Sequence, residues 1–178
     1  MCSFEEPTGM CNWAQDDDDE LDWELGQGET SSFFTGPKRD HTLGLSSGHF
    51  IFLEASYPAE EGERARIASP VLNSTGFSCE LRFYWHMYGD DIGALNIYTR
   101  TTFGGEMDKI WSKDYNVGDF WNRAEIVLME NEPFQVVLEA VVGDGYGGDI
   151  AIDDTSFTPA CGLSNVNLVT VSTPKPTT

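Results

Sequence analysis

Three carboxylates stand at alternate positions in the stretch Glu20-Leu21-Asp22-Trp23-Glu24. Side chains two residues apart along an extended strand point to the same face, so this spacing would gather Glu20, Asp22 and Glu24 on one surface. Two carboxylates flanking a glycosidic bond are the machinery of a retaining glycosidase, in which Glu20 would be the nucleophile and Glu24 the acid/base. The stretch therefore supports a carbohydrate-binding or glycoside-hydrolysing function as one hypothesis.

The position of these carboxylates argues against that hypothesis. The stretch resembles the ExDxE signature of jelly-roll β-glucanases, but that signature lies mid-chain between strands that carry aromatic substrate platforms. Here it begins at Glu20, the last residue of the acidic run Asp16–Glu20 near the N-terminus. The run lacks the glycine and the ligand spacing of a calcium loop, so we expect a solvated acidic loop. Such a loop would attract a basic partner and quicken its association.

Other catalytic patterns do not occur in the sequence. The three histidines His41, His49 and His86 are not spaced like metal ligands, and there is no HExxH motif. No GxSxG elbow and no phosphate-cradling glycine loop is present either. We expect His86 to be a partly exposed strand residue rather than a general base. The sequence predicts a protein that is not an enzyme.

The charge balance excludes one class of partner. The chain has 178 residues, with 10 Lys+Arg against 30 Asp+Glu and a formal net charge of −20. Such a surface repels nucleic acid and the anionic face of a membrane. No stretch approaches the ~20 apolar residues of a membrane span, so we expect no direct membrane insertion. Hydrophobic residues at 40% and aromatic residues at 12% indicate a folded chain rather than a disordered one.

The cysteines and one sequon point to an oxidising compartment. Four cysteines allow three pairings, of which Cys2–Cys11 together with Cys79–Cys161 is the most economical. Asn73-Ser74-Thr75 is an acceptor sequence for N-glycosylation. Together they favour an extracellular or cell-surface location. The first residues lack the features of a signal peptide, so we expect a piece of a longer secreted or membrane-anchored protein.

Strand-like runs separated by Gly, Asp, Asn and Pro clusters dominate the chain, and we see no amphipathic helix of ten or more residues. The runs are 49–54, 65–70, 79–88, 93–100, 123–128, 134–141 and 149–157. Many short strands separated by turn signals predict an all-β sandwich or barrel. After residue 162 the chain becomes rich in Ser, Thr and Pro. We therefore expect a domain over 1–162 and a linker or tail over 163–178.

Ten short motifs follow one another from Cys2 to Cys161. They are Cys2-Ser3-Phe4-Glu5, Cys11-Asn12-Trp13, Asp22-Trp23, Thr35–Thr42 (TGPKRDHT), Gly48–Phe52 (GHFIF), Ala65–Pro70 (ARIASP), Phe83–Gly89 (FYWHMYG), Gly93-Ala94-Leu95, Phe134–Glu139 (FQVVLE) and Gly148–Asp154 (GDIAIDD). In this order they resemble the MAM domain, the module named after meprins, the A5/neuropilin protein and receptor phosphatase mu. Each motif alone is a weak signal, whereas the ordered set is specific.

The resemblance implies a jelly-roll-like β-sandwich of two antiparallel sheets with the two disulfides favoured above. It also implies a non-catalytic extracellular module that mediates cell adhesion or homo-oligomerisation. The expected partner is accordingly a protein, either a second copy or a receptor with a basic patch.

A calcium ion is expected as a structural cofactor. Asp153 falls on a mostly apolar strand face, where a carboxylate needs a partner or a cation. In related jelly rolls the first and last strands lie side by side, so Glu5 would approach Asp153, and Asp40 would complete an oxygen cage of the kind calcium prefers. The alternative is that Asp153 accepts backbone N–H bonds and Glu5 pairs with an arginine.

Overall fold

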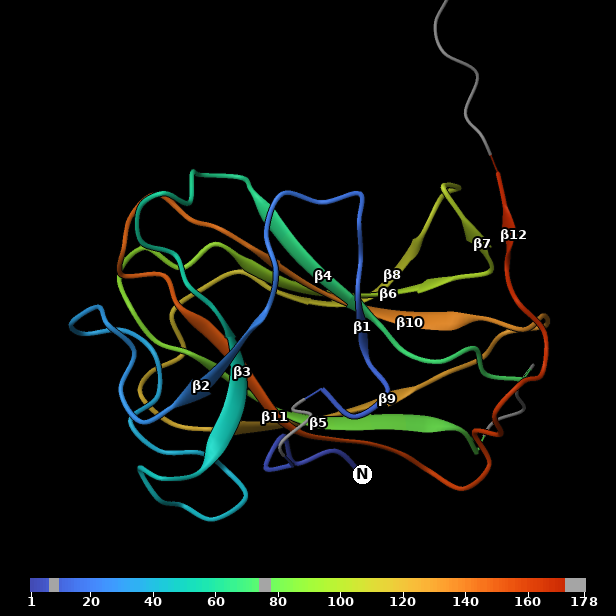
Figure 1. Cartoon of the computed structure of the whole chain (residues 1–178), viewed down its shortest axis with the longest axis horizontal. Coiled ribbons are helices and arrows are strands. Elements are labelled where there is room, and N and C mark those ends of the chain that lie inside the picture. Colours follow the sequence, from blue (N-terminus) through green and yellow to red (C-terminus); the bar gives the residue numbers. More distant parts are fainter. Residues whose placement is uncertain (7–9, 74–77, 172–178) are drawn as a thin grey trace, which may run out of the picture.

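The computed structural model describes residues 1–6, 10–73 and 78–171, which form a β-sandwich (Figure 1). Twelve strands occur in these residues: β1 (Ala14–Gln15), β2 (Glu24–Gln27), β3 (His49–Leu53), β4 (Arg64–Ala68), β5 (Glu80–Met87), β6 (Ala94–Arg100), β7 (Thr102–Phe103), β8 (Asp108–Lys113), β9 (Asn122–Val127), β10 (Gln135–Val141), β11 (Ile150–Phe157) and β12 (Val169–Thr170).

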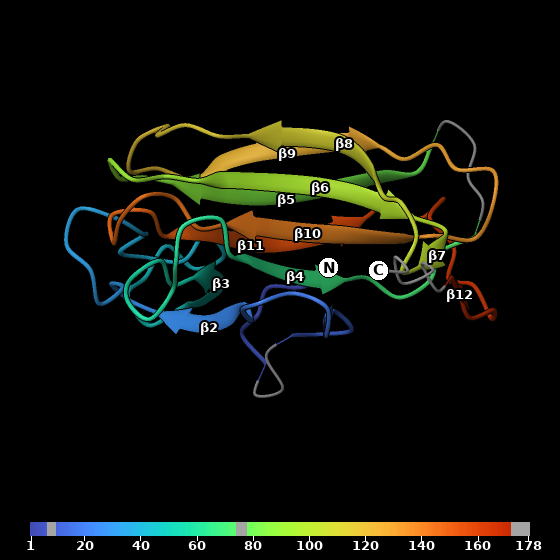
Figure 2. The ribbon, with the colours of Figure 1, turned by 90° about the horizontal axis from the view of Figure 1, so that it is seen from above.

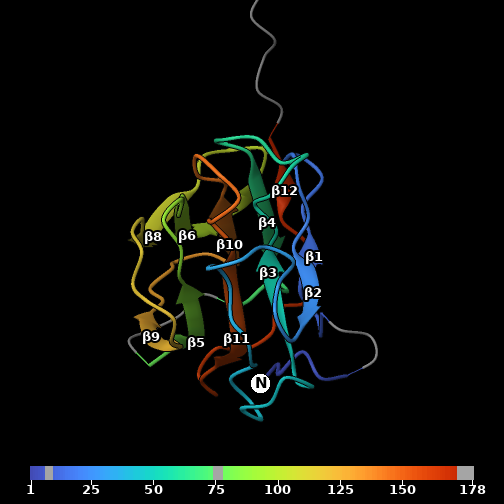
Figure 3. The ribbon, with the colours of Figure 1, turned by 90° about the vertical axis from the view of Figure 1, so that its left-hand side faces the viewer.

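The strands build two five-stranded antiparallel sheets. One has the order β1-β4-β10-β6-β8 and the other the order β2-β3-β11-β5-β9, which we call sheet one and sheet two. Figure 2 looks onto sheet one with sheet two behind it, and Figure 3 shows the two sheets as stacked layers. Strand β12 pairs with β7 in parallel as a small third sheet. No helix long and apolar enough to cross a membrane is found in the residues described. The predicted all-β class and two-sheet sandwich are confirmed.

Each of the seven predicted runs contains a strand, but β2, β8 and the two-residue strands β1, β7 and β12 were not predicted. Strand β2 includes Gly26, and a Cβ there would come within 2.8 Å of the rings of Phe50 and Phe52. Glycine is a poor strand former, yet here it makes room for two aromatic side chains on the neighbouring strand. Strand β8 has no clean apolar alternation, because its residues are mostly half-buried or exposed at the sheet edge.

The interior of the sandwich is apolar and fully covered. Leu81, Phe83, Trp85 and Met87 of β5 point inward, as their alternation predicts, and are buried with the inward residues of β10 and β11. Burial of this kind stabilises a fold by roughly 1.5–3 kcal/mol for each large side chain.

Sheet two also carries a smaller cluster on its outer face. Phe50, Phe52 and Ala151 form it, and Trp121 packs against them. The indole Nε1 of Trp121 donates to the backbone oxygen of Arg39 at 2.9 Å, which joins the cluster to the long connection between β2 and β3. This connection, residues 28–48, we call the cover segment. It contains the TGPKRDHT motif, so the motif lies over the sheet's outer surface.

Both predicted disulfides are present. Cys2 bonds to Cys11, and Cys79 bonds to Cys161 across a sequence separation of 82. Residues 163–171, which we expected to belong to a linker, contact the sandwich: Leu163 bridges to Leu72, and Leu168 is buried. The Ser/Thr/Pro-rich residues 172–178 lie outside the described part of the chain.

Candidate interaction surface

Two adjacent carboxylates of β11 hold the cover segment. The register of β11 against β5 shifts between Asp153 and Ser156, and Asp154 has a φ of 50°. This bulge lets both Asp153 and Asp154 reach the cover segment, a use typical of β-bulges. An Asp154 oxygen lies 2.6 Å from Nδ1 of His41, and the Thr42 hydroxyl donates to Asp154 at 2.8 Å.

Asp153 is fully buried and accepts backbone hydrogen bonds. The N–H of His41 donates to it at 2.8 Å, that of Thr42 at 3.3 Å and that of Asp154 at 2.8 Å. Burial raises the pKa of Asp153 to about 7, and the charge of Asp154 adds to the rise, while the three N–H donors oppose it. The alternative anticipated for Asp153 is therefore what the structure shows.

The other two predicted calcium ligands lie within or beside the cover segment: Asp40 belongs to it, and Glu5 contacts His49, the residue that follows it. Asp40 accepts the N–H groups of Leu43 and Leu45 at 2.9 and 3.0 Å. It packs over Gly48, where a Cβ would stand only 2.0 Å from the carboxyl carbon. Glu5 accepts the N–H of His49 at 2.6 Å and contacts its Nδ1 at 3.0 Å, so its partner is a histidine rather than an arginine.

Glu5, Asp40 and Asp153 do not meet as one cage. Each is held by its own protein donors, and the described residues contain no group of three or more His, Cys, Asp or Glu side chains that could hold a metal. The arrangement does not fit the expected oxygen cage, and calcium binding stays a prediction that no observation here tests.

The glycosidase hypothesis loses its geometric basis. Strand β2 begins only at Glu24, so Glu20 and Asp22 precede the strand and do not share its face. Glu20 instead bonds the Arg64 guanidinium at 3.2 and 3.3 Å, and this bond lowers the pKa of Glu20. The prediction that the three carboxylates lie along one strand was wrong, because the chain pairs with β4 before it enters β2.

The acidic run Asp16–Glu20 is only partly the solvated loop that we expected, because Asp17, Asp18 and Glu20 are exposed whereas Asp16 and Asp19 are partly buried. Asp16 forms a largely buried two-pronged ion pair with Arg100 of β6, with N···O distances of 2.8 and 2.9 Å. Asp19 accepts the N–H of Arg66 at 2.6 Å, and burial raises its pKa to about 6. With Glu20 bound to Arg64, three of the five acids fasten the N-terminal segment to sheet one. The sequence did not reveal these contacts because the partners are 44 to 84 residues away in sequence.

His86 is buried rather than partly exposed. Its relative exposure is 1%, because the ring of Trp121 lies 5.4 Å away and Asp119 reaches Nε2 at 3.0 Å. Burial lowers the pKa of His86, although the Asp119 carboxylate opposes the shift. Alternation along β5 correctly predicted that His86 faces away from the interior. It could not reveal that loop 114–121 covers that outer face.

Five segments meet at one end of the sandwich, which we call the loop end. They are residues 28–37, 54–63, 88–93, 114–121 and 142–149. In Figures 1 and 2 this end lies at the left, opposite β12. Hydrogen bonds brace the segments against one another. The Thr35 hydroxyl donates to the backbone oxygen of Tyr88 at 2.7 Å and accepts the N–H of Asp149 at 2.9 Å. Gly62 N–H donates to Val142 at 2.9 Å.

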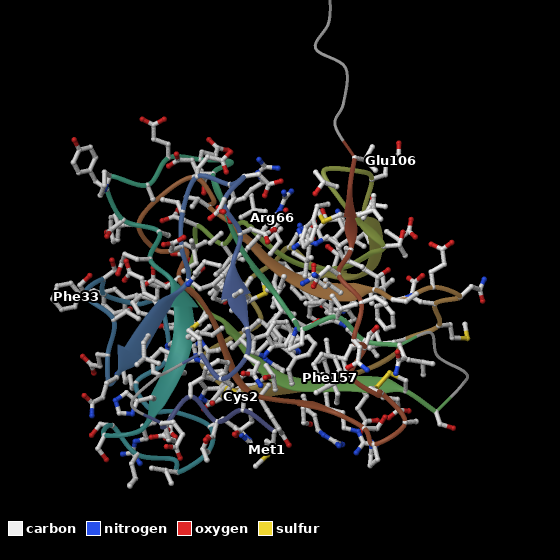
Figure 4. The ribbon with its side chains drawn as sticks, turned by 45° about the vertical axis from the view of Figure 1, so that its right-hand side comes forward. Met1, Cys2, Phe33, Arg66, Glu106 and Phe157 are labelled. Atoms are coloured by element: carbon white, nitrogen blue, oxygen red, sulfur yellow. A yellow bond between two sulfur atoms is a disulfide. The ribbon has the colours of Figure 1, made fainter. Side chains whose placement is uncertain are left out.

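Six aromatic side chains of the loop end are exposed; Tyr115 and Phe120 are each 54% exposed, and the other four are more than 60% exposed. The relative exposures are 79% for Phe33, 83% for Phe34, 93% for Tyr57 and 64% for Tyr146. Phe33 stands out at the edge of the molecule in Figure 4. Sequence reasoning missed these residues. The available signal was Phe33-Phe34, an apolar pair among Ser, Thr and Gly in a stretch without strand alternation.

The loop end is also strongly acidic. Its five segments contain eleven acidic residues and no lysine or arginine. The eleven are Glu29, Glu54, Glu60, Glu61, Glu63, Asp90, Asp91, Asp114, Asp119, Asp144 and Asp149. They were not recognised as a group because each segment contributes only a few, far apart in the sequence.

Asn73, the predicted glycosylation site, is exposed. Its side-chain amide donates to the backbone oxygen of Leu163 at 3.1 Å. The rest of the sequon lies outside the described residues, so glycosylation stays a prediction.

The sequence matches a known family. The family model described as "MAM domain, meprin/A5/mu" matches residues 2–162. The chain is 40% identical over 162 residues to human "MAM domain-containing glycosylphosphatidylinositol anchor protein 1". That alignment covers 88% of this chain and 17% of the human protein. The chain is 34% identical over 157 residues to human "MAM domain-containing protein 2", with 88% and 22% coverage. The chain thus spans about a fifth of the length of these curated relatives.

Solved structures share the fold at low identity. The K1 cleaved adhesin domain of Lys-gingipain from Porphyromonas gingivalis W83 aligns with a TM-score of 0.60 at 13% identity, covering 88% of this chain and 95% of that one. The family 11 carbohydrate-binding module from Clostridium thermocellum aligns with a TM-score of 0.51 at 10% identity, covering 91% and 95%. At such identities these similarities establish the sandwich alone.

Proposed function

Because the chain belongs to the MAM domain family, we propose that it is a non-catalytic protein-interaction module mediating adhesion within a larger secreted or membrane-anchored protein. The MAM domain is an extracellular module, and the two disulfides suit that setting. The role of the whole protein is part of the proposal, since the chain spans only about a fifth of its relatives.

The exposed aromatic side chains of the loop end are the observation that carries this proposal. Soluble domains seldom leave several large aromatic residues exposed together, and where they do the patch commonly marks an interaction site. Tyrosine and other aromatic residues are enriched among the residues that dominate interface energies. Here Phe33, Phe34, Tyr57 and Tyr146 stand on loops that hydrogen bonds already hold in place.

The experiment presents the module in many copies. Biotinylated module on streptavidin-coated beads is mixed with cells, with identical beads and with a glycan array. We expect saturable binding to cells or beads that reduction of the disulfides abolishes and that protease treatment of the cells removes. Binding only to the glycan array would contradict the proposal and favour the carbohydrate-binding alternative. No binding in any arm would also contradict it.

Self-association needs a separate measurement, because the expected partner includes a second copy. Light scattering coupled to size exclusion at several concentrations, with and without EGTA, reports the oligomeric state. A concentration-dependent dimer would support homophilic binding. A strictly monomeric species throughout would remove the homophilic part and leave binding to a different protein.

A further inference from the structure

We propose that the loop end binds a basic segment of a different protein, in which arginine or lysine alternates with apolar side chains. The proposal rests on the interaction function proposed above and adds the surface that docks and the chemistry of its partner.

The apolar part of the argument comes from the four most exposed aromatic side chains of the loop end, Phe33, Phe34, Tyr57 and Tyr146. Phe34 has a φ of 59°, in the left-handed region that residues with a β-carbon disfavour. The neighbouring Thr35, which bonds both Tyr88 and Asp149, fixes the backbone beside it. A site already ordered before binding loses little entropy when a partner docks. Aromatic faces also attract guanidinium and ammonium groups, so the same residues suit a basic partner.

The negative charge of the loop end favours a positively charged partner. Among the described residues, the exposed carboxylates of Glu60, Glu61, Asp90 and Asp144 form no salt bridge. Lys38, just outside the five segments, lies 4.0 Å from Glu29 and offsets one of the eleven acids. Carboxylates of one sign repel one another, and a basic partner both relieves that repulsion and is steered toward the surface.

A buried acceptor lies beneath the same surface. Asp149 is fully buried and accepts the N–H of Ala55 at 2.9 Å with one oxygen. Its second oxygen has no hydrogen-bond partner in the described chain. Burial raises the pKa of Asp149 to about 6, and the charge of Glu54 adds to the rise. At neutral pH Asp149 is therefore still mostly ionised and adds negative potential below the exposed carboxylates.

A second copy of this chain is a poor occupant for the loop end. It would bring the same eleven acids against these eleven, with no lysine or arginine from either set of segments. Like charges facing each other across an interface cost several kcal/mol. The far position of β12 leaves the loop end uncovered by the last described residues (Figure 1).

The test uses fluorescein-labelled dodecapeptides of alternating Arg and Leu, with Glu-Leu and Ser-Leu peptides as controls. Fluorescence anisotropy is recorded with the intact module at two salt concentrations. We expect binding of the Arg-Leu peptide alone, weakened by salt. The variant Glu60→Lys/Glu61→Lys should weaken that binding at least tenfold. The matched control Asp17→Lys/Asp18→Lys makes the same charge change at exposed acids outside the loop end and should change it less than twofold.

The aromatic part is tested by Phe33→Ser/Phe34→Asn, since asparagine tolerates a positive φ better than other residues. We expect at least tenfold weaker binding. Met129→Ser removes a side chain that is 62% exposed in the loop between β9 and β10, at the opposite end, and should have no effect. Circular dichroism with thermal melts of each variant confirms that the fold is retained.

Equal weakening by the two double-lysine variants would overturn the proposal, because attraction would then be spread over the whole acidic protein. Equal binding of the Ser-Leu peptide would overturn the choice of a basic partner. If the module dimerises and the loop-end variants are monomeric, a second copy is the occupant, and the proposal is overturned. Failure of the peptide assay while beads still bind cells would remove this inference alone. Failure of the bead assay would remove the proposed function.

Discussion

The run Asp16–Glu20 and the loop end both carry dense negative charge, but their carboxylates have different partners. In the run, Asp16 is paired with Arg100 and Glu20 with Arg64. At the loop end, exposed acids such as Glu61 and Asp144 have no salt bridge among the described residues. The denser cluster in the sequence is thus the more neutralised one in space. Contiguity in sequence does not tell whether a carboxylate is available to a partner.

The topology explains this difference. Strand β1 pairs with β4, so residues 16–20 run beside β4 and meet its arginines and Arg100 of β6. The acids fasten an N-terminal segment that has only a two-residue strand of its own. The five segments of the loop end contain no lysine or arginine, and the nearest basic residues in the sequence, such as Lys38, lie just outside them.

Removing one member of the buried pair should give the largest effect. We expect Asp16→Ala to lower the free energy of unfolding by about 3–5 kcal/mol, because Arg100 is left as a buried charge without its partner. Asp144→Ala, an exposed acid of the loop end, should change it by less than about 0.5 kcal/mol. Urea unfolding measures both. Equal losses would contradict the distinction between the two regions.

The pH dependence of stability should report Asp19. Its pKa is raised to about 6 in the folded state from 3.8, so the folded chain holds this proton more tightly than the unfolded chain. The contribution of this group is fully present below about pH 4 and is lost as the pH rises through about 6. The free energy of unfolding should therefore fall as the pH rises from about 4 to about 7. We expect Asp19→Asn to reduce this fall by on the order of 1 kcal/mol, after allowance for solvent screening.

The exposed neighbour Asp18 supplies the control for that measurement. Asp18→Asn should leave the slope of unfolding free energy against pH unchanged between pH 4 and 7. If both variants flatten the slope alike, the burial of Asp19 is not its cause.

The exposed ion pair between Glu20 of the acidic run and Arg64 should contribute less to stability. Glu20 and Arg64 are both more than a third exposed, and such pairs contribute roughly 0.2–1 kcal/mol. We expect Glu20→Gln to lower the free energy of unfolding within that range and 0.5 M salt to reduce the difference. A loss comparable to that of Asp16→Ala would mean that exposure does not separate the two pairs.

Charge reversal at the loop end should have the smallest effect on the fold. We expect Glu60→Lys/Glu61→Lys to leave the melting temperature unchanged or slightly raised, because the reversal reduces repulsion on an acidic surface and breaks no salt bridge in the described residues. Differential scanning calorimetry at low salt measures this. A marked loss of stability would show that these acids serve the fold.

Much of the fold could be predicted from residues alone. Alternation along Leu81, Phe83, Trp85 and Met87 predicted a strand with an inward face, and that face is buried. The outer face of the same strand could not be assigned, because its cover is the connection 28–48 and loop 114–121, which have no periodicity. His86 was misjudged for that reason.

The candidate site was predicted less well, for a different physical reason. The predicted ligands Glu5, Asp40 and Asp153 do not form one cage, because their donors are backbone N–H groups of the cover segment and, for Glu5, of His49 in β3. Backbone donors leave no residue-type signal in a sequence. The loop end escaped prediction because its residues are assembled from five connections whose proximity depends on the whole topology.

The most direct test of the central claim is a titration of the ¹⁵N-labelled module with the Arg-Leu peptide, followed by NMR. The claim is that the loop end is the docking surface, whereas the run Asp16–Glu20 is part of the fold. It predicts that amide signals of residues 29–35, 57–63, 90–91 and 143–147 shift in a saturable way while those of residues 16–20 stay in place. Shifts centred on residues 16–20, or spread evenly over both sheets, would contradict it.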